Sequence, residues 1–245
     1  MISVSQLTVA YDRHAALRGI DGCFEAGSMT AVVGPNGAGK STLVKALVGI
    51  LRPASGRILR QGMKARDVAY LPQAAEIDRT FPITVADTVS LGAWRQIGAF
   101  RAATRDVLDG TEQALRAVGL DGFARRHIGS LSAGQFQRVL FARLLLQDAP
   151  TIILDEPFTA IDARTTRDLL DLVRRWHGEQ RTVIAVLHDF DQVRANFPRA
   201  LLLAREQIAW GPTEEAMSAD NLLRARAMAE RWEDEANAVD RRGVA

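Results

Sequence analysis

The apolar positions of this chain change their period along its 245 residues, and the changes predict an α/β fold. Over residues 2–11 apolar and polar positions alternate, with a break near Gln6. A second run, residues 17–24, is suited to pair with the first, and Gly27 then turns the chain into the next strand. These segments predict a small antiparallel sheet packed beside a mostly parallel core.

Three short and mostly apolar runs predict buried strands of that core. They are residues 30–33, 151–154 and 182–187, in each of which a threonine precedes the apolar residues, and a glycine-rich or polar group follows each of them. Ligands of doubly wound folds bind at the carboxyl ends of parallel strands. One nucleotide site could therefore use the ends of all three strands.

An amphipathic helix is predicted between the last two of these strands. Its apolar positions, Leu169, Leu172, Val173 and Trp176, have the spacing of one helix face, and Asp162 is suited to cap its N-terminus.

The intervening and final segments complete the predicted organisation. Residues from about 74 to 149 are rich in helical patterns and lack clear strand runs, so we expect a helical subdomain inserted in the core. The runs 200–203 and 207–210 predict a closing hairpin. We expect one domain over residues 1–229 and a charged, flexible tail over residues 230–245.

The most specific chemistry lies in the stretch GPNGAGKST at residues 34–42, which matches the phosphate-loop pattern G-x-x-x-x-G-K-[ST]. A strand, a glycine-rich turn and a helix N-terminus make an anion site, because backbone N–H groups and the helix dipole point at one spot. Lys40 would reach the β- and γ-phosphates of a nucleotide, and the Ser41 hydroxyl would ligate Mg²⁺. The predicted nucleotide-binding residues are Gly34, Asn36, Gly37, Ala38, Gly39, Lys40, Ser41 and Thr42.

An acidic pair follows the second buried strand. Asp155 is suited to hold Mg²⁺, and Glu156 beside it is suited to activate a water against the γ-phosphate. Taken alone, the pair could be a solvated turn. Beside a phosphate loop, the catalytic interpretation is favoured.

The stretch LSAGQ at residues 131–135 leads into an apolar-periodic helix. Ser132 and Gln135 fit a capping box, which is one interpretation of the stretch. The same stretch resembles the signature motif of ABC-type ATPases, and both interpretations can hold together. The resemblance covers about residues 2–215.

The other motifs of that family appear in the family's order. Residues 34–42 resemble the Walker A loop, and residues 152–157 resemble Walker B with its catalytic glutamate, Glu156. Residues 71–73 look like the Q-loop, and residues 159–162 look like the D-loop. His188 resembles the switch histidine, and Tyr11 falls where the family places an aromatic residue that stacks on adenine.

The resemblance implies a mechanism. Gln73 would ligate Mg²⁺ or position the attacking water, and His188 would contact the γ-phosphate and hold Glu156 and the water in place. Two copies of the chain would pair head to tail around ATP, so that the signature of one closes on the nucleotide held by the other. The closing residues would be Ser132, Gly134, Gln135 and Asp162.

One position departs from the commonest signature, which carries glycine where this chain has Ala133. We expect function to survive the added methyl group. A strained φ angle at Ala133 would slow hydrolysis.

The composition of the chain narrows the possible functions and locations of the protein. A formal net charge of +2 gives no case for nucleic-acid binding, and the single cysteine, Cys23, cannot form an intrachain disulfide, which fits a reducing compartment. No apolar run approaches the roughly 20 residues of a membrane span, and the first residues lack a basic leader. We expect a peripheral subunit held on the cytoplasmic face of the inner membrane by a permease.

The segment at residues 76–87 carries the cargo hypothesis. This segment, most of all Phe81-Pro82, is similar to that of ATPases of zinc, manganese and ferrous-iron importers, and residues 205–212 are similar to the same branch. Phe81 and Trp94 are candidates for contact with a coupling helix of the permease, with core packing equally open.

The sequence thus predicts the ATP-hydrolysing subunit of a divalent-metal importer, with zinc ahead of manganese. Its partners would be a second copy of itself, an integral membrane permease and, indirectly, a metal-binding solute-binding protein. The alternatives are the ATPase of a siderophore, haem or cobalamin importer and a soluble ABC ATPase without a transport role.

Overall fold

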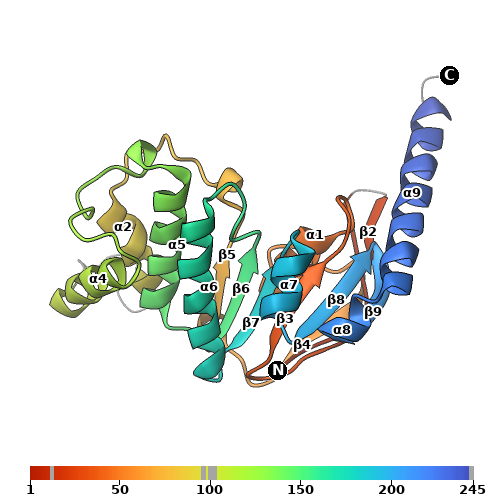
Figure 1. Ribbon diagram of the computed structural model, residues 1–245, viewed down its shortest axis with the longest axis horizontal. Helices are drawn as coiled ribbons and strands as arrows, with labels where there is room; N and C mark the ends of the chain where they lie inside the picture. The colour runs from red at the N-terminus through yellow and green to blue at the C-terminus, as the bar shows by residue number, and fades with distance from the viewer. Residues whose placement is uncertain (12–13, 95–97, 99–103, 243–245) are drawn as a thin grey trace. The chain divides into compact units, whose positions relative to one another are not determined.

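The computed structural model describes residues 1–11, 14–94, 98 and 104–242 of the chain. The chain forms two compact units, shown in Figure 1. Unit 1 comprises Met1–Gly62 and Ile184–Ala245, and unit 2 comprises Met63–Val183. Within the described ranges, no helix has both the length and the apolar character required to cross a membrane.

An antiparallel sheet opens unit 1. Its strands are β1 (Ile2–Tyr11), β2 (His14–Phe24) and β4 (Ser55–Arg60), in the order β2-β1-β4. The pairing of β1 shifts register after Val4, and Gln6 has a φ of 47°. This bulge lets β1 keep one face buried on both sides of Gln6, and it explains the break in the alternation. The predicted N-terminal antiparallel sheet is confirmed.

The core strands of unit 1 are short and buried. β3 (Met29–Val33) leads through the glycine-rich loop into α1 (Lys40–Val48), and β8 (Arg199–Ala204) runs parallel to β3. β9 (Glu206–Pro212) returns antiparallel to β8 after a turn at Arg205, whose φ is 60°. The predicted closing hairpin is therefore present.

Strand β7 (Thr182–Val186) begins in unit 2 and ends in unit 1. Three helices follow it in the described part of unit 1. They are α7 (Phe190–Asn196), α8 (Thr213–Ala216) and α9 (Ala219–Arg242). In Figure 1, α9 (blue) follows α8 and extends to Arg242, the last described residue. The helix therefore continues through positions that the sequence pattern suggests as a flexible tail.

Unit 2 is built on two parallel strands, β5 (Val68–Leu71) and β6 (Thr151–Asp155), and every residue of β6 is buried. Helix α5 (Ala133–Gln147) packs on β5 through two side chains. Arg143 donates to the carbonyl of Tyr70 at 2.9 Å, and Gln147 donates to the carbonyl of Val68 at 3.1 Å. The burial that these contacts require lowers the pKa of Arg143.

The remaining helices of unit 2 cover the segment predicted to be helical. They are α2 (Val85–Ser90), α4 (Arg105–Ala117) and α6 (Ala163–Gly178), with the short turns η1 (Ala65–Asp67), η2 (Ala74–Glu76), η3 (Leu91–Ala93) and η4 (Ile128–Ser130). Trp176 of α6 stacks on Phe141 of α5, with ring centroids 5.7 Å apart. The two parallel strand pairs and the covering helices confirm the α/β class.

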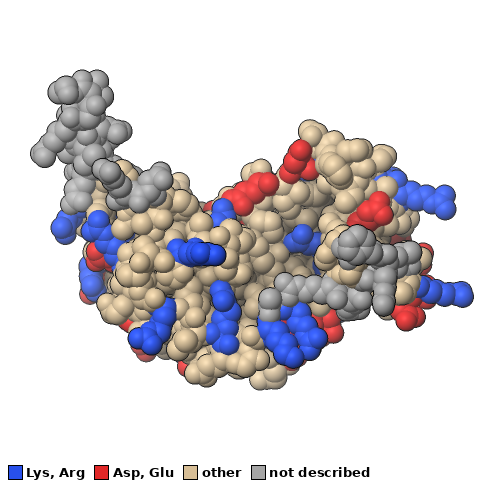
Figure 2. Space-filling model, turned by 180° about the vertical axis from the view of Figure 1, so that it is seen from behind, with Lys and Arg blue, Asp and Glu red and all other residues tan. Residues whose placement is uncertain are grey.

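Charged side chains are spread over the surface. Figure 2 shows one face, on which Lys and Arg side chains are scattered among uncharged residues, with some Asp and Glu side chains between them. This arrangement agrees with the near balance of 31 basic and 29 acidic residues in the chain.

Candidate active site

The phosphate loop connects a buried strand to a helix that has no side-chain cap. β3 ends at Val33, the chain turns at Gly34, and α1 begins at Lys40. The N-cap residue is Gly39, with a φ of 88°, and it has no side chain that could accept from the first turn of α1. A bound anion can therefore take the place of a capping side chain.

Three glycines fix the path of this loop for different reasons. A Cβ at Gly34 would lie 2.0 Å from the carbonyl oxygen of Leu203, and one at Gly39 would lie 2.5 Å from that of Ala16. Backbone cannot yield to such contacts, so both positions require glycine. At Gly37 a Cβ would meet nothing within 4 Å, and the requirement there is the φ of 72°.

Lys40 holds its charge inside the loop. Its side chain is buried, and Nζ donates to the carbonyl oxygens of Gly34 and Pro35, each at 2.9 Å. The ammonium group therefore lies among the backbone groups of the predicted anion site, where it can neutralise a phosphate.

The phosphate loop also contacts residues that are distant in the sequence and that no local sequence pattern predicts. The N–H of Arg205 donates to the carbonyl of Ala38 at 3.0 Å, and the N–H of Arg18 donates to the carbonyl of Arg205 at 2.8 Å. Trp232 of α9 stacks under both guanidinium groups, 4.3 Å from that of Arg18 and 5.2 Å from that of Arg205. These contacts tie α9 to the phosphate loop.

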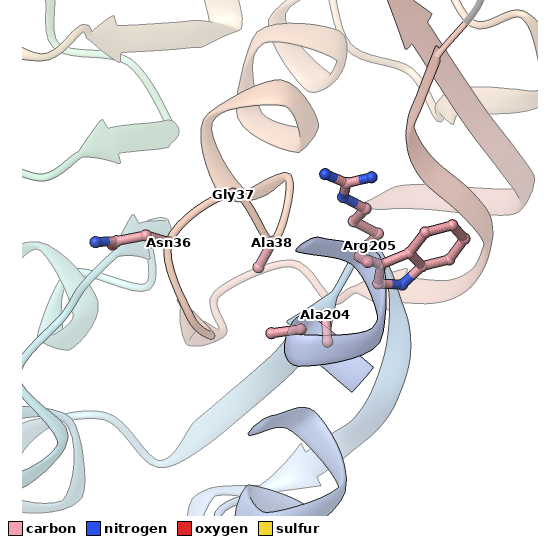
Figure 3. A pocket seen from close by; sticks show the side chains of 7 residues that line it. Asn36, Gly37, Ala38, Ala204 and Arg205 are labelled. Carbon is pink, nitrogen blue, oxygen red and sulfur yellow. The ribbon is translucent and has the colours of Figure 1, made fainter. Parts of the chain in front are cut away.

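A small pocket of about 100 Å³ lies between the loop and α9. It is lined by Asn36, Gly37, Ala38, Ala204, Arg205, Ala229 and Trp232. In Figure 3 the side chain of Asn36 points away from Ala38, Ala204 and Arg205.

His188 lies near the phosphate loop within unit 1. The N–H of Leu187 donates to the carbonyl of Val32 at 3.1 Å, which puts the end of β7 beside the end of β3. His188 follows directly and is exposed. Asp189 then caps α7 by accepting from two backbone N–H groups at 3.0 Å.

The acidic pair terminates β6 in unit 2. The side chain of Asp155 has no solvent exposure, and the Tyr70 hydroxyl donates to its Oδ2 at 3.5 Å. Glu156 has a φ of 51°, a left-handed conformation that costs a non-glycine residue about 1 kcal/mol. The Thr159 hydroxyl donates to Oε2 of Glu156 at 3.4 Å.

Gln73 lies at the same edge of the strand pair. Leu71, at the end of β5, is in register with Leu154 of β6, one residue before Asp155. Gln73 follows Leu71 by two residues and is half-buried. Unit 2 thus brings the three predicted residues Gln73, Asp155 and Glu156 to one edge.

The signature stretch forms the N-terminus of α5 and caps itself. The Ser132 hydroxyl accepts from the N–H of Gln135 at 3.2 Å, and Oε1 of Gln135 accepts from the N–H of Ser132 at 3.0 Å. This is the predicted capping box. Ala133 is the first residue of α5 and has no positive φ, so the strain considered for it does not arise.

Asp162 lies beside the signature. Its Oδ1 accepts from the N–H of Arg164 at 3.0 Å and from that of Thr165 at 2.9 Å, which caps α6 as predicted. The N–H and the hydroxyl of Thr165 stabilise the charged form, so the pKa of Asp162 is lowered. A Cβ at Gly134 would lie 3.5 Å from Oδ2 of Asp162, so the two predicted residues are neighbours.

Tyr11 ends β1 and is 47 % exposed. Its ring is therefore accessible to a planar ligand, as an adenine-stacking residue must be.

The chain is similar to known proteins along most of its length. The family model described as "ABC transporter" matches residues 17–159. The manganese transport system ATP-binding protein MntB of Listeria monocytogenes is 36 % identical over 225 residues, covering 90 % of this chain and 94 % of that protein. The zinc transport system ATP-binding protein TroB of Treponema pallidum is 38 % identical over 228 residues, covering 91 % of this chain and 86 % of that protein.

Solved structures share the fold. CbiO1 from Clostridium perfringens, part of an ABC transporter complex, superposes with a TM-score of 0.73 at 26 % identity, over 91 % of this chain and 92 % of that one. A dimeric bacterial ABC transporter cassette superposes with a TM-score of 0.78 at 24 % identity, over 87 % and 99 %. The motifs, the fold and these similarities agree: the chain belongs to the ABC transporter family and is one of its ATP-binding ATPases.

Proposed function

We propose that this chain powers the import of a divalent metal ion, with zinc ahead of manganese. The similarity to the manganese and zinc transport proteins, along most of each chain, supports this cargo class. The observation that carries the transport role is the exposed apolar side chain of Phe81, which follows the Q-loop by eight residues and is 63 % exposed.

Phe81 borders a groove suited to a partner. The groove has a volume of about 680 Å³ and is lined by Arg79, Thr80, Phe81, Pro82, His127, Gly129 and Ser130. Trp94, also in unit 2, is 52 % exposed. Phe81 is a large apolar side chain exposed beside a groove, which favours docking over core packing, and the exposure of Trp94 supports the same interpretation. The partner we infer is a helix of an integral membrane permease.

In the proposed reaction, Lys40 neutralises the β- and γ-phosphates of ATP. Glu156 accepts a proton from the attacking water, a bond forms between the water oxygen and the γ-phosphorus, and the bond from that phosphorus to ADP breaks. His188 donates a hydrogen bond to the γ-phosphate and keeps the water in line. ADP and inorganic phosphate are the products.

The donor atoms fit a magnesium ion. The Ser41 hydroxyl, the Asp155 carboxylate and the Gln73 amide all offer hard oxygen donors, which Mg²⁺ prefers. When bound, the ion would spread the phosphate charge that develops during transfer. Asp155 is buried at a strand end, so its carboxylate is held in one place for this role.

Two copies would pair head to tail around ATP. Ser132, Gly134 and Gln135 would close on the γ-phosphate of a nucleotide held by the other copy, and Asp162 would support them. The fold shared with a dimeric cassette supports this arrangement. The chain would sit on the cytoplasmic face of the membrane through its permease, which would receive the metal from a solute-binding protein.

The test is the metal content of cells grown under metal limitation. Cells with the native chain, cells without it and cells carrying Lys40→Ala are compared for zinc, manganese and iron. A zinc deficit in both defective strains, reversed by added zinc, is the expected result. A manganese deficit instead would keep the importer and change its ion, whereas no deficit in any metal would overturn the cargo proposal in favour of a chelate or a soluble role.

A further inference from the structure

The segment that follows the Q-loop lies against the segment that precedes the signature helix. Within unit 2, the N–H of Ile128 donates to the carbonyl of Ile83 at 3.1 Å. A Cβ at Gly129 would lie 2.8 Å from the carbonyl oxygen of Arg79, so the two segments are in close contact. The groove at Phe81 takes one wall from each segment.

The side chain of Arg79 contacts residues that precede Ser132 in the sequence and a residue that follows it. Its Nη2 donates to the carbonyl oxygen of Leu131, and to that of Ile128 at 3.4 Å. The same guanidinium lies over the ring of Phe136, 4.8 Å from its centroid. Leu131 directly precedes Ser132, and Phe136 lies one turn beyond it in α5. One planar cation therefore holds the backbone before Ser132 and the helix after it.

We propose that Arg79 is a positioning residue that orients Ser132 and links it to the Phe81 groove. This role rests on the proposed function, in which a permease occupies the groove and Ser132 closes on ATP. Only one residue separates Arg79 from Phe81, so a displacement of the groove wall displaces the anchor of the signature. The planar guanidinium fork can donate to carbonyl groups in fixed directions while its face stacks on a ring, whereas an ammonium group has no flat face to stack.

The first experiment measures dimer closure in the isolated chain. In a Glu156→Gln background, which binds ATP without turnover, the ATP concentration for half-maximal dimerisation is measured by light scattering. Arg79→Ala raises this concentration about tenfold, the loss expected for a charged hydrogen bond. Binding of a fluorescent ATP analogue to the monomer stays within about twofold, because Arg79 lies outside the phosphate loop.

Two further variants keep this experiment decisive. Arg79→Lys keeps the charge and solubility and is expected to lie between the native chain and Arg79→Ala. Arg126→Ala is the matched control, because the Arg126 guanidinium also stacks on a ring in unit 2, that of Phe123 at 4.0 Å, which is not part of the signature stretch. An unchanged dimerisation midpoint in both Arg79 variants overturns the proposal. An equal loss of monomer binding also overturns it, because the effect would then be global.

The second experiment tests the link to the groove. In a Cys23→Ala chain carrying Glu156→Gln, a fluorophore is attached through Phe81→Cys, and its emission is followed as ATP closes the dimer. The emission changes in the presence of Arg79 and stays constant in Arg79→Ala at an ATP concentration that closes the dimer. An equal change in both chains overturns the link. These assays require no cargo, so a failure of the metal proposal would leave their outcome standing.

Discussion

Two helices begin at predicted phosphate-binding loops, α1 in unit 1 and α5 in unit 2, and their first turns are completed differently. Helix α1 starts behind Gly39, which offers no side chain as a cap, and Lys40 adds a buried positive charge. Helix α5 starts behind Ser132, whose hydroxyl and backbone both pair with Gln135. The first helix has room for an anion in place of a cap, whereas the second already has its cap.

This difference predicts that the two loops contribute to nucleotide binding in different ways. A loop with a lysine and no cap can bind ATP in a single chain. A self-capped helix without a lysine gains little from a free phosphate, because it would exchange one hydrogen bond for another. It can add affinity only where a second site already holds the nucleotide. The difference therefore predicts that nucleotide binding and dimer closure are separable steps.

Removing the charge from the first loop is expected to have the largest effect. Lys40→Ala should weaken ATP binding by roughly tenfold to a hundredfold, because each charged hydrogen bond contributes about 1.5–3 kcal/mol, and turnover should become undetectable. Titration with a fluorescent ATP analogue measures the change. Arg174→Ala, which removes an exposed charge on α6, serves as the control. Native affinity in Lys40→Ala would contradict the assigned role.

Removing the hydroxyl from the second loop is expected to separate binding from turnover. Ser132→Ala should leave monomer binding within about twofold and reduce ATPase activity about a hundredfold, as for loss of a group that stabilises the transition state. The lost cap should lower the free energy of unfolding by about 1 kcal/mol. Gln135→Ala, which keeps the hydroxyl, should retain more activity than Ser132→Ala. Equal activities would mean that only the cap matters.

Lowering the pH should reveal how much the ionised cap of α6, Asp162, contributes to the stability of the fold. The pKa of Asp162 in the folded chain lies below its ordinary value of 3.8. Its ionised form therefore stabilises the fold above pH 3.8, and this stabilisation is lost as the pH falls through the folded value. Asp162→Asn caps without ionising. The difference in Tm between the native chain and Asp162→Asn should change below pH 3.8 and be constant above it, and a constant difference throughout would contradict the assignment.

Restoring the commoner signature residue is expected to have the smallest effect. Ala133 is exposed and helical, so Ala133→Gly should lower the free energy of unfolding by less than about 1 kcal/mol and change ATPase activity by no more than about twofold. Steady-state ATPase assays and denaturant titration measure both. A large gain in turnover would show that the methyl group obstructs closure.

Local patterns predicted much of this structure because they record local physics. The loop at residues 34–42, the Ser132 capping box, the Asp162 cap and the hairpin at Arg205 all depend on residues within a few positions of one another. Each of these predictions could be made without knowing the rest of the fold.

Other features of the structure could not be predicted from a local sequence pattern. The mostly exposed strand β4 shows no alternation, and β5 has only four residues. The contact between Arg79 and Leu131 spans 52 positions, and Trp232 lies far along the chain from Arg18. The left-handed conformation of Glu156 has no signal in the sequence either, because the residue is not glycine. Pairings of this kind follow from the tertiary fold and not from a local pattern.

The most direct test of the account mixes two defective chains. In a Glu156→Gln background, differently tagged chains carrying Lys40→Ala or Ser132→Ala are combined with ATP, and heterodimers are captured through both tags. A head-to-tail pair has one intact site, with Lys40 from one copy and Ser132 from the other. We expect ATP-dependent heterodimers with one nucleotide per pair, in an amount that neither variant yields alone. No heterodimer above the level of the single variants would contradict the shared site.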